Sequence, residues 1–241
     1  MKIPPLPEID LANFAVLAAD HRRNALEHFR ISRPPYRYVP LRKSVPEILN
    51  VHAGFFGALP RTPYEKIAGT IRSEAWSPEE AEANLRVAEG LYEHAELHKL
   101  SGRRHDIFPM NIGTDHKLVY WQSLALQVEG RALVPFLDPR RQATRLSVMG
   151  RRFVFSMMHE RIRAADPDFA DIVLGVFQFS VPKAGPRLPV LYTDQKLELF
   201  SFSELDRMVR DTYTDWQAVC EERADQARRA AGGAGGMFGG A

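Results

Sequence analysis

Two histidines stand four residues apart within a stretch whose apolar spacing predicts a helix. His94 and His98 occupy positions i and i+4, so a helix places both imidazole rings on one face. Imidazole nitrogens bind zinc, but a zinc site needs at least one further protein ligand from elsewhere in the chain. The pair is therefore a candidate metal site, and the alternative interpretation is two polar side chains on a helix surface.

A second set of polar residues brackets the apolar stretches in the middle of the chain. Asp115 precedes a predicted strand, Asp138-Pro139-Arg140 ends the next one, and Glu160 lies on the helix expected after it. Carboxylates at such positions can bind a divalent metal that activates water.

The predicted strand pairing separates two of these carboxylates. The expected hairpin turns at Glu129-Gly130, so paired residue numbers sum to 259. Asp138 then faces Trp121, and Asp115 lies six residues further along, roughly 20 Å away at about 3.3 Å per residue. Carboxylates that share a metal lie within a few ångströms of it. Asp138 therefore has a second interpretation, as a residue that initiates a turn at a solvated strand end.

The order of the predicted elements from 78 to 179 resembles the core of the restriction-endonuclease-like nucleases. A helix is followed by three strands, a helix and a strand. That family carries a carboxylate near the second strand and a carboxylate-x-lysine sequence on the third, whereas Asp138-Pro139-Arg140 has arginine in place of the lysine. The resemblance implies a catalytic site drawn from Asp115, Asp138, Arg140 and Glu160, with Mg²⁺ as its cofactor.

A segment rich in arginine, tyrosine and proline covers residues 33–46. Its four prolines favour an extended or polyproline-like path. Positive charge beside aromatic rings can hold single-stranded nucleic acid, and proline-rich segments also dock in protein grooves. We expect this segment to bind a protein partner or its own domain more than nucleic acid, and a plain linker is the third interpretation. The residues concerned are Arg33, Tyr36, Arg37, Tyr38, Arg42 and Lys43.

Helical periodicity dominates the first hundred residues. Asp10 is placed to cap a first helix that ends near Ser32, before two prolines. Short helices are expected at 46–58 and 63–73. The clearest helix start is Ser77-Pro78-Glu79-Glu80, which has the residues of a capping box. Gly102 is placed to close that helix.

The periodicity then changes to that of strands. The alternation across 118–137 predicts a β-hairpin, and the run 170–179, apolar on both faces, predicts a central strand. A helix is expected between them at 145–165. Further strands are predicted at 108–114, 187–192 and 196–200, and Ser201 with Glu204 opens a last long helix. The predicted fold is α+β: a helical N-terminal region at 1–75, a mixed or antiparallel sheet flanked by helices at 76–230, and a disordered glycine-rich tail at 231–241.

Composition narrows the function classes. The net charge is +2, from 32 basic and 30 acidic residues, so no long-range field favours nucleic acid or anionic lipid. The single cysteine, Cys220, excludes an intramolecular disulfide and suits a reducing compartment. We therefore predict a non-enzymatic interaction or assembly protein, an adaptor of the bacterial cytosol, with a protein partner, no membrane contact and no cofactor. The alternative is a divergent or inactive metal-dependent nuclease-like protein that binds nucleic acid.

Overall fold

A computed structural model describes residues 3–30, 38–52, 60–128, 130–141 and 143–234. Within these residues six strands form one sheet, in the same order along the sheet as along the chain. The strands are β1 Val51–His52, β2 Ser101–Arg104, β3 Leu124–Val128, β4 Arg131–Asp138, β5 Val173–Phe179 and β6 Pro189–Thr193.

The sheet is mixed. β1 pairs with β2, and β4 with β5, in the parallel sense, while the other neighbouring pairs are antiparallel. β1, β2, β4 and β5 consequently run in one direction, and their carboxyl ends meet at the same edge. β5 has a hydrogen-bonded neighbour on both sides, which confirms the central strand predicted from its apolar run.

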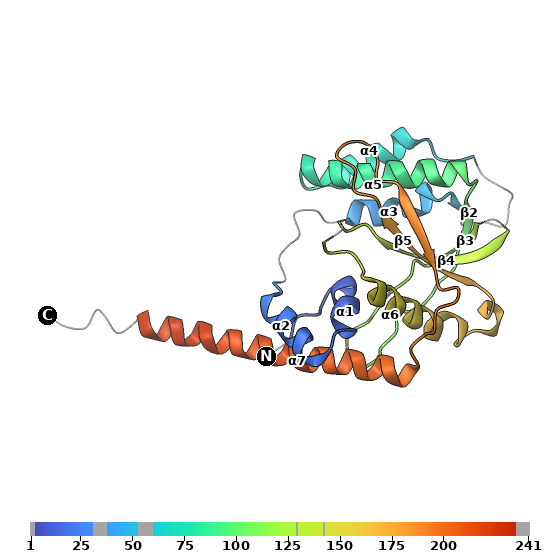
Figure 1. Ribbon diagram of the computed structural model, residues 1–241. Helices are drawn as coiled ribbons and strands as arrows, with labels where there is room; N and C mark the ends of the chain where they lie inside the picture. The colour runs from blue at the N-terminus through green and yellow to red at the C-terminus, as the bar shows by residue number, and fades with distance from the viewer. Residues whose placement is uncertain (1–2, 31–37, 53–59, 129, 142, 235–241) are drawn as a thin grey trace.

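Helices cover both faces of the sheet, so the molecule has three layers (Figure 1). One outer layer holds α3 Val39–Ile48, α4 Tyr64–Glu74 and α5 Pro78–Leu97. The other holds α1 Glu8–Ala15, α2 Ala19–His28, α6 Val148–Met158 and α7 Phe202–Ala234. This arrangement agrees with the predicted α+β class. No helix within the described residues has the length and apolar character that crossing a bilayer requires.

The alternation of side chains along the strands divides the core in two. Leu133 and Leu137 of β4 pack with the α3–α5 layer, while Val134 and Phe136 pack with the α6–α7 layer. Both faces of β4 and β5 are buried, which is why their sequences are continuous apolar runs. Leu6 and Leu11, near the N-terminus, lie in the same cluster as α6 and α7. The helical N-terminal region thus shares its core with the rest of the chain.

The predicted hairpin is present, with the predicted register. Leu126 pairs with Leu133 and Val128 with Arg131, so the residue numbers sum to 259 as expected. The ladder does not continue to Trp121, because the Gln122 amide donates to the Pro135 carbonyl at 2.8 Å. The expected pairing of Trp121 with Asp138 is therefore wrong.

The first predicted helix is in fact two helices. α1 and α2 are separated at 16–18, and this break lets α1 pack on α6 and α7 while α2 packs on α7. Leu11 and Leu26 are fully buried by this arrangement. Asp10 lies inside α1 instead of capping it, and Pro7 occupies the N-cap position.

The predicted extended path through 33–46 is wrong where the structure describes it. Residues 39–48 form α3, with Pro40 in the first turn and Pro46 inside the helix. Leu41, Val45 and Ile48 are fully buried against α4 and α5, and this burial outweighs the hydrogen bond that Pro46 cannot donate. The predicted helix 46–58 is likewise wrong, since α3 ends at Ile48; 33–37 and 53–58 lie outside the described residues.

Two other predicted strands are not formed. Within 108–114, Met110 makes only an isolated bridge to Leu118, and 196–200 is irregular. The strand before the hairpin is instead β2, which contains Gly102. A side chain at Gly102 would meet the Ala125 carbonyl oxygen at 2.6 Å, so this glycine permits close strand packing and does not end α5.

The helix ends follow local capping signals. The Ser77 hydroxyl accepts a hydrogen bond from the Glu80 amide at 3.2 Å at the start of α5. Ser201 and Glu204 form the predicted capping box before α7, with the Glu204 carboxylate 2.8 Å from the Ser201 amide. α7 extends to Ala234, so the predicted disorder from 231 is wrong for its first residues, and 235–241 lie outside the described residues.

Candidate partner-binding site

Residues 194–200 form an irregular segment between β6 and α7 that is held at both ends. We call Asp194–Phe200 the anchored segment. At its start, the Asp194 carboxylate receives two hydrogen bonds from Arg163, at 2.5 and 3.2 Å, and one from the Leu174 amide at 3.3 Å. Arg163 also donates to the Ile172 carbonyl at 2.8 and 2.5 Å. The first residue of the segment is therefore fixed to β5 and to the loop before it.

A local irregularity in the preceding helix supplies the arginine. α6 continues as a π-helical turn over His159–Arg163, and such turns often occur at functional sites. Arg163 is the last residue of this turn. The turn thus brings an arginine 31 residues before Asp194 within ion-pair distance of it.

The other end of the anchored segment is fixed on α6. The Phe200 amide donates to the Ser156 hydroxyl at 2.9 Å, and the Arg152 guanidinium lies 4.0 Å from the centre of the Phe200 ring. Arg152 also donates to the Glu198 carbonyl at 2.5 Å. Between these contacts Gln195–Glu198 are exposed, so the chain presents a short peptide whose backbone is already ordered.

Four exposed apolar side chains lie within four residues of Arg152 or Glu198 along the chain. Leu197 within the segment is 40% exposed, and Phe202 just beyond it is 50% exposed. Val148 and Met149 are also exposed and precede Arg152 by one helical turn, which places them on the same side of α6. We call Val148, Met149, Leu197 and Phe202 the apolar patch. Aromatic residues and methionine are enriched where proteins bind one another.

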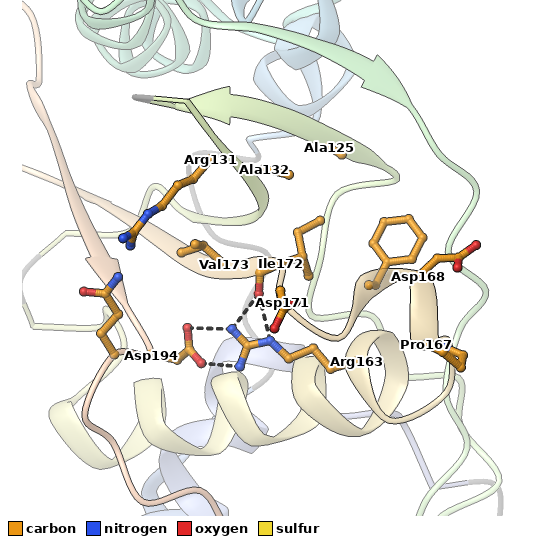
Figure 2. Close-up of a pocket in the computed structure, with 12 residues that line it drawn as sticks. Ala125, Arg131, Ala132, Arg163, Pro167, Asp168, Asp171, Ile172, Val173 and Asp194 are labelled. Carbon is orange, nitrogen blue, oxygen red and sulfur yellow. Dashed lines mark hydrogen bonds and ion pairs between the residues drawn. The ribbon is translucent and has the colours of Figure 1, made fainter.

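A cavity of about 580 Å³ opens beside the start of the anchored segment. Figure 2 shows the Arg163–Asp194 ion pair along one side, with Arg131 and Asp168 on other sides. Because Arg163 is bound to Asp194 and Ile172, its guanidinium is committed to holding the segment. The geometry of Arg163 and Asp194 therefore indicates a structural role, which is to fix the anchored segment, more than a catalytic one.

Comparison with known proteins gives two matches along nearly the whole chain. A family described as "Sliding clamp-binding bacterial toxin SocB" matches residues 9–226. The DNA replication inhibitor toxin SocB of Caulobacter vibrioides (strain NA1000 / CB15N) is 34% identical over 231 residues, which is 95% of each chain. The chain belongs to the SocB family. No solved structure matches.

Membership of the SocB family agrees with the predicted protein partner, because the family is described by a protein that it binds. It gives no support to the predicted nuclease resemblance, which stays a prediction. The absence of a cofactor likewise stays a prediction.

Asp138, the carboxylate at the centre of the nuclease interpretation, is fully buried in this SocB family member. It accepts hydrogen bonds from the Leu146 amide at 2.7 Å, the Gln178 side chain at 2.8 Å and the Arg140 amide at 3.3 Å. The hydrogen bond from the Arg140 amide, two residues further along, forms the turn that was predicted to begin at Asp138. The prediction that this strand end is solvated is wrong, because Asp138 is buried. Asp138 holds the loop between β4 and α6.

The other residues of that interpretation lie in different surroundings. Arg140 forms a two-pronged ion pair with Asp10 at 2.6 and 2.9 Å. Asp115 is exposed and lines a cavity beside α7, and Glu160 is half-buried on the π-helical turn. Within the described residues, no three His, Cys, Asp or Glu side chains gather as metal ligands.

The two predicted histidines are neighbours. The rings of His94 and His98 are 4.3 Å apart, and the His94 ring also packs edge-on against Phe177 of β5. Burial lowers the pKa of His94, and the charge of His98 lowers it further. The pair packs partly against the sheet, and a metal role for it stays a prediction.

The described part of the arginine–tyrosine segment contacts its own domain. The Tyr38 hydroxyl accepts a hydrogen bond from Arg187 at 3.2 Å, and Lys43 pairs with Glu74 at 3.0 Å. Arg42 is exposed. Arg33, Tyr36 and Arg37 lie outside the described residues.

Sequence reasoning missed the anchored segment in this SocB family member, since it predicted a strand at 196–200. One available signal was Asp194, a carboxylate two residues after the end of the predicted strand at 187–192. The arginine that binds it lies on a different element, and no local pattern links the two.

Proposed function

We propose that this chain is a toxin that binds a bacterial sliding clamp and thereby inhibits DNA replication. The observation that carries the proposal is the 34% identity with the DNA replication inhibitor toxin SocB over 95% of both chains. The match at residues 9–226 to a family described as sliding clamp-binding supports the same partner. A match of this extent includes both helical layers and the sheet.

The anchored segment with the apolar patch is the surface we propose for the clamp. A peptide that is ordered before binding loses less conformational entropy on docking, and here Arg163, Ser156 and Arg152 provide that order. Leu197 and Phe202 supply exposed apolar area beside the ordered backbone. Affinity in protein interfaces usually depends on a few side chains packed near the centre of the contact.

The segment 33–46 remains the sequence-based candidate for the same role. In its described part, the apolar side chains Leu41 and Val45 are buried in the core. Arg42 and Lys43 remain exposed. These charges would steer association more than they would hold a complex, so we favour the anchored segment as the main contact.

Binding to the purified sliding clamp of the same bacterium tests the proposal, with Kd measured by calorimetry. We expect Leu197→Glu to weaken binding by roughly tenfold or more, the effect of losing a central apolar contact. The matched control is Leu97→Glu, because Leu97 is also exposed but lies at the end of α5 in the opposite layer. Its Kd should stay within about twofold, as expected for a surface residue outside the interface.

A second experiment compares the anchored segment with the segment 33–46 and also measures DNA replication in cells. Arg42→Gln with Lys43→Gln should change Kd less than Leu197→Glu does. Expression of the wild type, but not of Leu197→Glu, should reduce incorporation of labelled thymidine. Absence of clamp binding by the wild type would refute the function, whereas equal effects of Leu197→Glu and Leu97→Glu would refute only the proposed surface.

A further inference from the structure

The topology creates a crevice at the carboxyl edge of the sheet. The connection from β1 to β2 passes through α4 and α5 on one face, and the connection from β4 to β5 passes through α6 on the other. Since β1, β2 and β4 run in the same direction, their carboxyl ends lie at one edge, where the connection from β1 leaves toward one face of the sheet and the connection from β4 leaves toward the other. Open α/β sheets usually bind their ligands in such a crevice.

A cavity of about 420 Å³ occupies this position. It is lined by Arg104 at the end of β2, by Phe136 near the end of β4, and by Trp121 before β3. Arg42 of α3 and Glu8 of α1 approach it from the two helical layers. A volume of about 300–1,000 Å³ is usual for small-molecule sites.

Two arginines that line this cavity have guanidinium groups available to bind a ligand. Arg42 and Arg104 are exposed, and within the described part of the chain the guanidinium group of neither takes part in a hydrogen bond or ion pair, although their backbones do. Arg140, in contrast, is fully engaged with Asp10. Arginine is the side chain best suited to bind phosphate, because its donors match the phosphate oxygens in pairs.

The remaining lining suits a larger ligand than free phosphate. Glu8 and Asp106 offer carboxylate oxygens without pairing with either arginine, so they can accept hydrogen bonds from hydroxyl groups. Glu8 lies in the first turn of α1, where the helix dipole offsets its charge. Trp121 and Phe136 are largely buried, with 3% and 5% of their surface exposed, and form an apolar wall.

We propose that this cavity binds a small organic phosphate with a hydroxylated, partly apolar body, the chemical class to which nucleoside phosphates belong. Arg42 and Arg104 bind the phosphate, Glu8 and Asp106 accept from the hydroxyl groups, and Trp121 and Phe136 contact the apolar part. The site lies on α1, α3 and the sheet edge and includes no residue of the anchored segment. The proposal therefore does not depend on clamp binding.

Calorimetric titration of the full chain with adenosine monophosphate, adenosine and inorganic phosphate tests the site. We expect saturable binding of adenosine monophosphate, at least about tenfold tighter than that of adenosine or of inorganic phosphate, because charge-assisted bonds to phosphate and contacts to the body act together. Absence of saturable binding at millimolar adenosine monophosphate would overturn the proposal. So would equal affinity for the nucleoside, since the arginines would then contribute nothing.

Matched variants separate the site from general charge effects. Arg42→Gln with Arg104→Gln should weaken nucleotide binding by roughly a hundredfold, about tenfold for each charge-assisted contact removed. The control, Lys43→Gln with Arg103→Gln, removes the same charge one residue away from each position, at exposed side chains that do not line the cavity. Its affinity should stay within about threefold, allowing for long-range charge. Equal losses in the two double variants would overturn the assignment of the arginines.

Discussion

The guanidinium of Arg163 and the carboxylate of Asp194 form a two-pronged ion pair, with oxygen–nitrogen distances of 2.5 and 3.2 Å. Their side chains are only 18% and 8% exposed. The pair joins the π-helical turn after α6 to the first residue of the anchored segment, and Arg163 also satisfies the Ile172 carbonyl. One arginine thus links α6, β5 and the proposed contact surface.

Arg163→Ala should leave Asp194 buried without its partner and lower the free energy of unfolding by about 3 kcal/mol. It should also weaken clamp binding, because the anchored segment would lose its fixed start. Chemical denaturation and calorimetry measure the two effects. The control is Arg210→Ala at the exposed pair with Asp206, where the loss should stay below about 1 kcal/mol. Similar losses in both variants would show that the Arg163 pair is no stronger than a surface pair.

Asp138→Asn should destabilise the chain by about 1–3 kcal/mol. The side-chain NH₂ group of asparagine would replace one carboxylate oxygen and would face an N–H group that now donates to Asp138. Thermal and chemical unfolding measure this. Asp115→Asn, at an exposed carboxylate, should change stability by less than about 0.5 kcal/mol.

The same two variants also address the nuclease alternative. We predict that neither they nor the wild type cleave DNA or RNA with Mg²⁺ or Mn²⁺. Metal-dependent cleavage by the wild type that Asp138→Asn abolishes would favour the nuclease interpretation over an interaction protein.

The lowered pKa of His94 predicts a stability change with pH. Burial disfavours the charged imidazole in the folded chain, so on acidification the unfolded chain takes up the proton first, near its ordinary pKa of about 6.5. The contribution of His94 is therefore complete above that pH and is lost as the pH falls toward the lower folded pKa. Denaturation between pH 7.5 and 5 should show a shallower decline for His94→Gln than for the wild type.

His21→Gln, at an exposed histidine, should keep the wild-type slope. The metal alternative is tested on the same proteins by elemental analysis. We predict that His94→Gln with His98→Gln leaves the metal content unchanged, and stoichiometric zinc that this double variant loses would establish a metal site instead.

Leu174→Asp should prevent stable folding. Leu174 lies on the central strand β5 with no exposed surface, and an unpaired carboxylate there costs several kcal/mol, comparable with a domain's total stability of about 5–15 kcal/mol. Val190→Asp on the edge strand β6, where the side chain is 44% exposed, should cost less than about 1 kcal/mol. A soluble Leu174→Asp variant with an unchanged melting temperature would contradict the described position of β5 in the sheet.

Much of the local structure could be predicted because its causes lie within a few residues. The capping serines Ser77 and Ser201 act on amides three residues away, and the hairpin register follows from the position of its turn. The apolar run at 170–179 indicated a strand buried on both faces. Predictions were wrong where a local preference competed with burial. The prolines of 39–48 favour an extended path, but the apolar face of α3 is buried against α4 and α5, and the helix persists.

Hydrophobic periodicity and helix capping depend on neighbouring residues, so the α+β class, the central strand and the two capped helices follow from the amino-acid sequence. Which distant side chains meet depends instead on the tertiary structure. The packing of the layers buries Asp138, which accepts hydrogen bonds from Leu146 and Gln178. The same packing pairs Arg163 with Asp194 and places Arg42 and Arg104 around one cavity. Such contacts depend on how layers pack across the sheet, and no repeat or spacing along the chain specifies which two elements will carry the partners.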